Sequence, residues 1–302
     1  MTTAAASTTG RLSPLVWVCL AAVYFVRGST YLAIRFALEA YPPLFFPGVR
    51  FVAAGSVLMI VLRLRGQRLP TAGQFARSAV IGFLLLNIGN GAVVYAQRDV
   101  GSALAATAVA TMPLWASLCG GIWGLWPKTL QWFGLAVGFT GIVLLNLDGD
   151  FAANPLSAAL LIAASMSWAF GSVWSRRLDL PSGAMSTACQ MLSAGVVFLV
   201  ASAVAGESWQ LVTTPKAMAA LAYLTVFGSI VAFSAYMYLN QTVSPSLATS
   251  YAYVNPVVAV LLGALLAGEL FVASELAAIV LVLSGVVLIV LNNRAPRVVR
   301  AA

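Results

Sequence analysis

Two arginines, Arg27 and Arg50, lie well inside long apolar stretches of this 302-residue chain. A charge at the bilayer centre costs ~2.5–3.5 kcal/mol on insertion scales, so each side chain should face protein or water. Arg27 lies ~20 Å into its stretch by helical rise, too deep for an easy escape to either interface. It could hold a substrate carboxylate, with snorkelling or a structural bond to carbonyls as the alternative. Arg50 follows Pro47 closely, and snorkelling or a structural bond to carbonyls is at least as good an interpretation for it. In the repeat alignment Arg50 pairs with Gln190, which favours a polar contact between the two halves over a ligand residue.

Polar side chains recur at spacings of three or four residues, which would place each pair on one helical face. The pairs are Asn87 with Asn90, Thr107 with Thr111, and Tyr251 with Asn255, while Tyr24 and Trp168 add aromatic rims. Amides and phenols suit a zwitterion with an apolar side chain, because they can bind its polar head while rings pack on its body. Each Asn or Thr alone could instead make an interhelical hydrogen bond, worth about 0.6 kcal/mol on average.

Acidic residues and histidine are missing from these stretches. No Asp or Glu lies well within any of them, and the chain has no His. Proton-coupled exporters often use a buried carboxylate, so the sequence favours facilitated diffusion or exchange over proton antiport. It contains no paired carboxylates, His-based triad or metal cluster, and we therefore expect no enzyme activity, no metal and no cofactor.

Two prolines, Pro113 and Pro256, lie near the middle of apolar stretches. A proline leaves the carbonyl four residues earlier without its hydrogen bond. In lipid such backbone is tolerated only where protein, water or ligand covers it. We predict a helix break at each proline and a binding site near the bilayer midplane, with a packing kink as the alternative.

The elements that must position these residues are membrane spans. Hydrophobic residues make up 61% of the chain and charged residues 8%, with mean hydropathy +0.96, whereas a soluble domain carries about a quarter charged residues. Runs near the ~20-residue length of a bilayer span are predicted at 14–36, 43–64, 74–96, 101–125, 129–147, 155–175, 184–205, 216–239, 245–268 and 273–292. Residues 1–13 and the basic segment 293–302 are predicted to be tails, and no cleaved signal is expected.

The basic residues are distributed unevenly over the predicted loops. With a cytoplasmic N-terminus, the outside loops hold Arg35, Arg98 and Lys216. The inside loops and tails then hold Arg11, Arg63, Arg65, Arg68, Arg77, Lys128, Arg176, Arg177, Arg294, Arg297 and Arg300. This bias follows the positive-inside rule. It predicts that both termini are cytoplasmic and argues against nucleic acid as the reason for the net charge of +8.

The chain also repeats itself. A shift of 143 residues places Pro113 on Pro256, and eight of thirty positions between 95–124 and 238–267 are identical. Two halves, 14–150 and 151–292, would each hold five spans, and an odd number inverts the second half relative to the first. The predicted fold is thus an all-α membrane protein of ten helices in two inverted five-helix repeats.

Several segments resemble a known family. VYFVRGSTYLAIRFALEAYPPLFFPGVRFVAAG, LLNIGNGAVVYA, SWAFGSVWSRRL and NQTVSPSLATSYAYVNPVVAVLLGALLAGE are similar to the drug/metabolite transporter superfamily, and within it to the EamA-type exporters of the YedA-like group. The resemblance implies ten helices in inverted repeats, a bacterial inner-membrane location and export of small metabolites, amino acids among them. Where the family commonly has Trp before the first GST, this chain has Arg27.

The resulting expectation is a secondary transporter that exports amino acids or similar small amphipathic metabolites by alternating access. The same fold could instead carry drugs, phosphorylated sugars or nucleotide-sugars, but phosphate favours clustered Lys and Arg, and cationic drugs would need a buried acid. Gly134-xxx-Gly138 predicts a close-packing seam, either internal or in a dimer. We expect a small-molecule substrate and membrane lipid as partners, no nucleic acid, and a chain that can act as a monomer.

Overall fold

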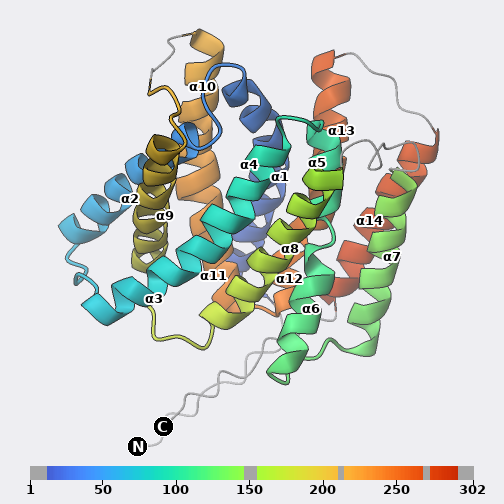
Figure 1. The fold of residues 1–302 in the computed structure, drawn as a ribbon. Helices are drawn as coiled ribbons and strands as arrows, with labels where there is room; N and C mark the ends of the chain where they lie inside the picture. Colours follow the sequence, from blue (N-terminus) through green and yellow to red (C-terminus); the bar gives the residue numbers. More distant parts are fainter. Residues whose placement is uncertain (1–11, 146–154, 210–213, 268–272, 292–302) are drawn as a thin grey trace, which may run out of the picture.

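The computed structural model describes residues 12–145, 155–209, 214–267 and 273–291, and all regular structure in these ranges is helical. Nearly all of the two predicted tails lies outside the described residues. The helices form one bundle in which segments far apart in the chain lie side by side (Figure 1). Each predicted span coincides with one helix or with a run of consecutive helices.

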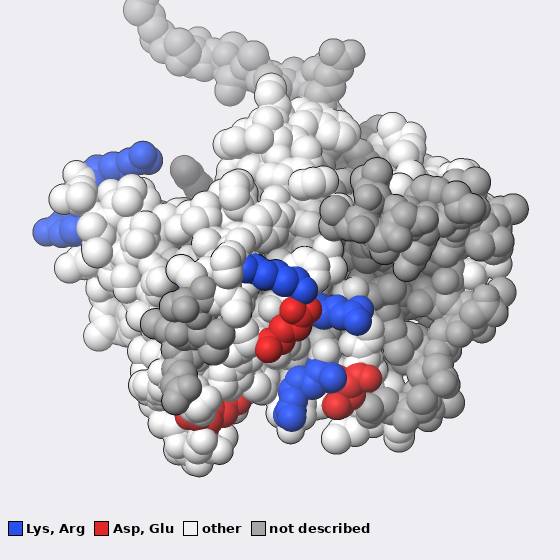
Figure 2. Space-filling view, turned by 90° about the horizontal axis from the view of Figure 1, so that it is seen from above, with Lys and Arg blue, Asp and Glu red and all other residues white. Residues whose placement is uncertain are grey.

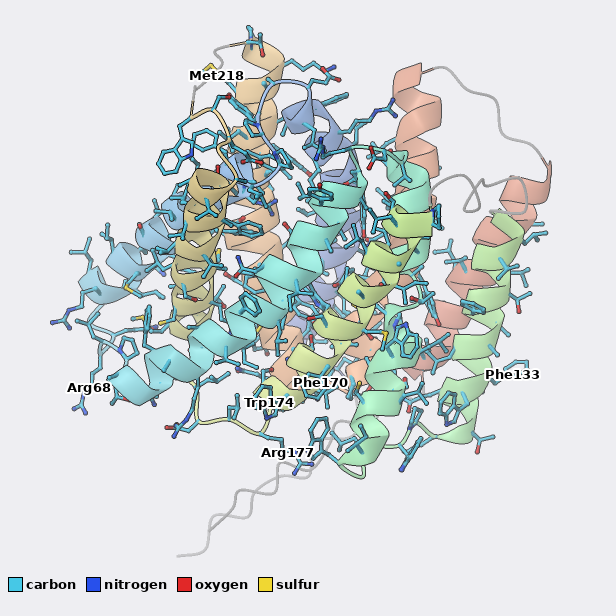
Figure 3. The ribbon with its side chains drawn as sticks, viewed as in Figure 1. Arg68, Phe133, Phe170, Trp174, Arg177 and Met218 are labelled. Atoms are coloured by element: carbon cyan, nitrogen blue, oxygen red, sulfur yellow. The ribbon has the colours of Figure 1, made fainter. Side chains whose placement is uncertain are left out.

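Six of the described segments are long and apolar enough to cross a membrane. Four of these are single helices, α1 (Pro14–Leu38), α2 (Phe45–Leu64), α8 (Pro155–Ser175) and α9 (Ala184–Val204). The other two are composite segments, Ala72–Ala96 and Pro215–Thr242. Large apolar side chains also face outward, as on α7 (Thr129–Leu145), where Phe133 is 59% exposed (Figure 3). An apolar exterior of this kind is compatible with lipid contact.

The two composite spans contain π-helical segments at matching places. The first runs through α3 (Ala72–Gly82), η1 (Phe83–Asn90) and α4 (Gly91–Ala96). The second comprises α10 (Pro215–Tyr223), η3 (Leu224–Phe233) and α11 (Ser234–Thr242). The 143-residue shift places all of η1 within η3. π-Helices are rare and occur frequently at functional sites. Their occurrence in both halves therefore marks these two composite spans as candidate parts of a functional site.

The fourth predicted span, 101–125 (span 4), is broken near its proline, as predicted. Helix α5 (Ser102–Val109) ends before Ala110, and α6 (Met112–Ile122) begins after Thr111, with Pro113 in its first turn. A proline at this place costs little, because the first N–H groups of a helix have no partner within it.

The ninth predicted span, 245–268 (span 9), departs from the prediction. Its break lies at Ser250, between α12 (Pro245–Thr249) and α13 (Tyr251–Ala267), and Pro256 lies inside α13. The predicted break at Pro256 is therefore wrong. Thr249 and Ser250 donate their hydroxyls to the Pro245 and Leu247 carbonyls at 2.8 Å, and hydroxyls that bond local backbone compete with regular helix.

Hydrogen bonds show that the first helices of the two halves are antiparallel. Along α1, Ser29 bonds Tyr223 and Glu39 bonds Lys216, so α1 runs against α10. Along α8, Ser172 bonds Tyr236 and Ser175 bonds Asn240, so α8 runs with α11. Because α10 and α11 belong to one span, α1 and α8 run in opposite directions. The two helices begin at opposite ends of the bundle in Figure 1.

The neighbours of each helix are preserved when the halves are exchanged. Helix α1 packs on α13 and η3, and its counterpart α8 packs on α6 and η1. Helices α2 and α9, which correspond to one another, pack together, as do α7 and α14 (Ala273–Leu291). The bundle therefore has the pseudo-twofold arrangement expected of two inverted repeats.

Glycines allow the equivalent helices to approach closely. A Cβ on Gly55 would lie 2.8 Å from the Leu192 nitrogen, and one on Gly195 would lie 2.7 Å from the Val52 nitrogen. The predicted Gly134-xxx-Gly138 seam packs inside the chain, because Gly285 of α14 lies against both glycines. Small residues at such crossings let backbones meet in a membrane protein, where lipid removes the hydrophobic drive to associate.

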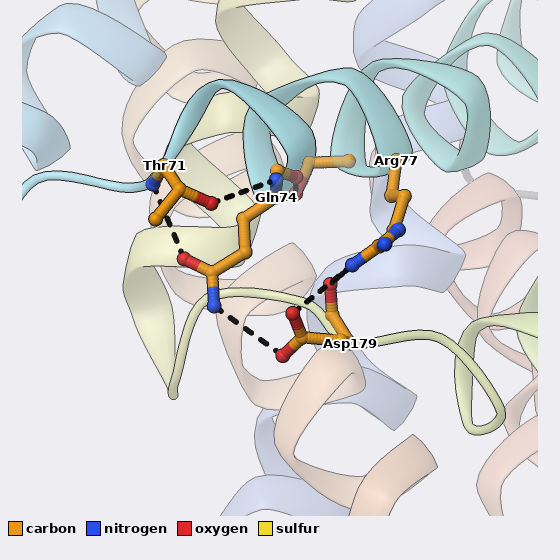
Figure 4. A network of polar contacts seen from close by, with 5 residues as sticks. Thr71, Gln74, Arg77 and Asp179 are labelled. Atoms are coloured by element: carbon orange, nitrogen blue, oxygen red, sulfur yellow. Dashed lines mark hydrogen bonds and ion pairs between the residues drawn. The ribbon is translucent and has the colours of Figure 1, made fainter.

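Polar contacts tie the halves together at the end of the bundle where α3 begins. Thr71 and Gln74 form a capping box at the start of α3, and the Gln74 amide donates to Asp179 in the α8–α9 loop (Figure 4). Arg77 forms a 3.0 Å ion pair with the same carboxylate. The pair is exposed, and such pairs contribute at most about 1 kcal/mol.

At the other end, Glu207 of the α9–α10 loop caps helix α2. Its carboxylate accepts hydrogen bonds from the Leu44 and Phe45 nitrogens, the latter at 2.8 Å, and from the Ser202 hydroxyl. A carboxylate at a helix N-terminus also interacts favourably with the helix dipole. Trp209 of the same loop packs on Phe45 at a centroid distance of 5.8 Å.

We expect Glu207→Ala to lower the free energy of unfolding by ~2 kcal/mol, because three donors lose a charged acceptor. The measurement is the melting temperature of the purified protein in detergent. Asp179→Ala is the matched control, since its carboxylate forms an exposed ion pair. Equal losses in the two variants would contradict a special role for Glu207.

Candidate functional site

A small cavity lies between the two halves, in the middle of the bundle. It is lined from the first half by α1, η1, α4, α5 and α6 and from the second by α8 and α13. Its volume is about 30 Å³, room for one or two water molecules. Five of the nine predicted binding residues line it, namely Arg27, Asn90, Trp168, Tyr251 and Asn255.

Arg27 is held among three aromatic rings. Its guanidinium carbon lies 4.2 Å from the Trp168 ring centroid, 5.0 Å from that of Tyr251 and 5.8 Å from that of Tyr236. One N–H group donates to the Tyr251 hydroxyl at 2.9 Å. Cation–π contacts of this kind contribute about 2 kcal/mol when desolvated. They stabilise the guanidinium beside the cavity without a carboxylate partner among the described residues.

Tyrosines connect Arg27 to both broken spans. Tyr251 donates its hydroxyl at 3.5 Å to the sulfur of Met112, the first residue after the break in span 4. Asn255 donates to the Tyr31 hydroxyl at 3.4 Å. Tyr24, which does not line the cavity, shares a 2.8 Å hydrogen bond with Ser250 at the break in span 9. Helix α1 is thus bonded through three side chains, those of Tyr24, Arg27 and Tyr31, to span 9 at and directly after its break.

Two buried acceptors around the cavity, Asn90 Oδ1 and Asn255 Oδ1, have no hydrogen-bond partner among the described residues. A buried polar atom without a partner costs roughly 1–3 kcal/mol. Both oxygens are closed to a water molecule in this conformation, so a polar ligand reaches them only when the cavity widens.

The remaining predicted residues lie elsewhere. Asn87 donates to the Ala194 carbonyl at 3.0 Å, an interhelical bond to α9. It separates from Asn90 because η1 is a π-helix, whose wider turns take residues three apart off a common face. Thr111 donates to the Ala108 carbonyl at 2.8 Å, and the side chain of Thr107 lies outside the described part of the chain.

Eight residues that line the cavity were not among the predicted site residues, namely Thr30, Tyr31, Ile34, Gly89, Val93, Val109, Met112 and Ala164. Tyr236, which contacts Arg27 from outside the lining, was not predicted either. Tyr31 follows Arg27 by one helical turn, so the i, i+4 spacing could have found it. Met112 directly precedes Pro113 at the break. Nothing in the local sequence marks Tyr236, which reaches Arg27 from a different span.

Comparisons with known proteins decide the family. The model of the EamA-like transporter family matches residues 12–147 and again 155–291. The chain belongs to the EamA-like transporter family. It is 47% identical over 275 residues to the uncharacterized inner membrane transporter YedA of Escherichia coli K12, covering 91% of this chain and 90% of that protein.

More distant relatives of this EamA-family transporter cover most of its length. Protein PecM of Dickeya dadantii is 26% identical over 87% of the chain and 88% of its own. A solved crystal structure with 18% identity superposes with a TM-score of 0.75, covering 92% of this chain and 98% of the other, which shows a shared fold. The chain is thus a multi-pass transporter of the inner membrane rather than an enzyme.

The second intramembrane cation of this EamA-family chain, Arg50, connects the halves. It is 2% exposed and donates from Nε to the Ser229 hydroxyl of η3 at 2.7 Å. Its guanidinium carbon lies 4.8 Å from the Phe51 ring centroid, and Nη1 has no partner among the described residues. The sequence-based view of Arg50 as a polar contact between halves agrees with the Ser229 bond.

Proposed function

We propose that the protein exports amino acids and similar small amphipathic metabolites across the bacterial inner membrane by alternating access. The observation that carries this proposal is one cavity between the halves that combines the Arg27 guanidinium with unpaired Asn90 and Asn255 oxygens. A zwitterion presents the complementary groups, a carboxylate for the cation and an ammonium for the acceptors.

The lining supports a ligand with both polar and apolar parts. A carboxylate would accept from the Arg27 N–H groups that Tyr251 leaves available, and an ammonium would donate to the two Asn oxygens. The substrate side chain would pack against Ile34, Val93 and Val109, which also line the cavity. Binding sites for small molecules commonly pair a few polar groups with apolar walls in this way.

Transport requires the cavity to widen, because about 30 Å³ is far smaller than an amino acid. The π-helical segments η1 and η3 lie beside this region in opposite halves and offer places where a span can change its hydrogen bonding. Motion of one repeat against the other around a fixed site is the general plan of inverted-repeat transporters.

The orientation we propose has both termini in the cytoplasm. Arg68 and Arg177 lie at one end of the bundle and Met218 at the other (Figure 3). At the end where α10 begins, basic side chains lie beside acidic ones (Figure 2), as in the Lys216–Glu39 pair. The excess of arginine at the first end supports placing that end inside the cell.

We further propose facilitated diffusion or exchange as the mode of transport. The cavity lining given by the described residues contains Arg27 but no Asp or Glu, and intramembrane carboxylates are the usual proton carriers. The alternative cargo is a drug or toxic compound, or a phosphorylated sugar or nucleotide-sugar, carried by the same fold. The single cation lining the cavity favours one carboxylate over clustered phosphates.

The test uses the purified protein in liposomes with labelled amino acids, with and without a pH gradient. Saturable uptake that is stimulated by unlabelled amino acid on the opposite side and ignores the gradient is expected. Strict dependence on the gradient would overturn the coupling mode. Flux without saturation or counter-transport would indicate a channel.

Asn255→Ala is expected to reduce uptake by about tenfold, because it removes an acceptor worth roughly 1–1.5 kcal/mol at the cavity. Tyr251→Ala should have a similar effect through loss of its bond to Arg27. The matched control is Asn87→Ala, since this amide bonds the Ala194 carbonyl away from the cavity. Membrane insertion should be normal in all three, and equal uptake by Asn255→Ala and Asn87→Ala would contradict the site.

A further inference from the structure

No acidic side chain among the described residues forms an ion pair with Arg50. The ion pairs among the described residues, Arg77–Asp179 and Lys216–Glu39, both lie at the ends of the bundle. Arg50 instead has a hydroxyl, an aromatic ring and one N–H group without a partner. A buried cation is expensive unless an anion compensates it, so the structure lacks a group of negative charge near this guanidinium.

The Arg50 guanidinium lies directly behind the wall of the cavity. At Gly228 of η3, a Cβ atom would lie 3.0 Å from Arg50 Nη2 and 3.2 Å from the Thr30 methyl group. Thr30 lines the cavity one turn along α1 from Arg27, and its hydroxyl donates to the Arg27 carbonyl at 2.6 Å. The side chain of Thr30 and Gly228, which has no side chain, thus separate Arg50 from the cavity.

Part of the wall between Arg50 and the cavity belongs to a π-helical segment. Gly228 and Ser229 both lie in η3, the π-helical counterpart of the segment that supplies Gly89 and Asn90 to the cavity. Any widening that admits an amino acid and moves η3 from α1 would open the ligand space towards Arg50. In a low-dielectric interior the attraction of a cation for an anion acts over several ångströms even before contact.

The electrostatic balance then selects the charge of the cargo. The guanidinium of Arg27 on α1 and that of Arg50, near Thr30, lie on this side of the cavity, and no described carboxylate pairs with either of them. A zwitterion with an apolar side chain supplies one carboxylate, which neutralises one cation. A second carboxylate on the substrate would neutralise the other, while the Asn90 and Asn255 oxygens receive its ammonium.

We propose that the preferred cargo is an amino acid with a second carboxylate, whose two acidic groups are held by Arg27 and Arg50. This inference rests on the proposed function, because it assumes that the cavity carries amino acids. It assigns Arg50 a role in substrate selection in addition to its contact between the halves.

The experiment compares substrates of nearly equal shape and different charge. Full-length protein is reconstituted in liposomes whose membrane potential is held at zero with equal potassium and valinomycin. Uptake of labelled glutamate is compared with glutamine, and aspartate with asparagine, with leucine and glycerol 3-phosphate as further arms. We expect the acidic member of each pair to have about a tenfold higher kcat/KM than its amide.

Arg50→Gln should lower the glutamate-to-glutamine ratio to near one while glutamine uptake continues, and Arg50→Lys should keep part of the preference. Gel filtration and melting temperature establish that each variant is folded. Ser229→Ala is the control, because it removes the hydroxyl partner but keeps the charge, and its ratio should stay high. If Arg50→Gln does not fold, the wild-type ratio and that of Arg50→Lys decide the question.

Each other outcome overturns a defined part of the proposal. Equal uptake of glutamate and glutamine by the wild type, or an unchanged glutamate-to-glutamine ratio in folded Arg50→Gln, would contradict the role of Arg50. Neither result would contradict amino-acid transport. Preferred uptake of glycerol 3-phosphate would replace the second carboxylate with phosphate. Absence of uptake for every amino acid would remove the proposed function itself.

Discussion

Arg27→Ala is expected to lower amino-acid uptake by about a hundredfold, the largest effect we predict on transport. Removing one member of a desolvated, hydrogen-bonded charge pair costs roughly 2–5 kcal/mol, and Arg27 is the cation that lines the cavity. The measurement is kcat/KM for the best amino-acid substrate in liposomes, with protein insertion quantified in the same vesicles.

Two further variants make this result specific. Arg27→Lys keeps the charge but loses the planar group that lies over Trp168 and the paired donors that fit a carboxylate, so we expect an intermediate loss. Arg98→Ala removes an exposed arginine that also lies near a tyrosine ring, 5.0 Å from that of Tyr95. Arg98→Ala should transport normally, and wild-type uptake by folded Arg27→Ala would contradict the binding site.

Gly285→Ala is expected to have the largest effect on stability. A Cβ at this position would lie 2.5 Å from the Gly138 nitrogen and 2.6 Å from the Gly134 carbonyl oxygen. Both are backbone atoms that cannot rotate away, so α7 and α14 must separate along the seam. We expect a loss of ~3 kcal/mol or more, measured as a lower melting temperature in detergent and a smaller yield of monodisperse protein.

Gly73→Ala is the matched control for this substitution. It is an exposed helical glycine of α3, and a Cβ there meets no atom within 4 Å. Alanine should be neutral or stabilising by up to about 1 kcal/mol, because it restricts the unfolded chain. Similar melting temperatures for the two variants would show that the α7–α14 seam tolerates added volume.

The sequence predicted the spans and the repeat because both can be recognised from residue types along the chain, without knowledge of which helices pack together. Apolar runs near bilayer length mark helices without knowledge of their neighbours, and aligned residues such as Pro113 and Pro256 reveal the duplication. Arg27 was recognisable as a site candidate because a charge deep in a span must face protein or water.

Side-chain directions depended on details that the sequence does not show. An ideal helix places Asn87 and Asn90 on one face, but the π-helical η1 turns Asn87 to the Ala194 carbonyl. Proline alone suggested the break in span 9, whereas hydroxyl bonds of Thr249 and Ser250 accompany a break six residues before Pro256. Both outcomes depend on the local path of the backbone, which residue type and hydropathy alone do not fix.

The sequence by itself indicated an all-α membrane protein with a duplicated plan and two deep arginines, and it predicted ten spans, of which six described segments are long and apolar enough to cross a membrane. Only the tertiary structure decided that Tyr236 and Tyr251 surround Arg27 with Trp168, and that Arg50 lies behind Thr30 at Gly228. The physical reason is that hydropathy and proline act within one helix. The surroundings of a buried charge are set by which helices pack against it, and those helices come from both halves of the chain.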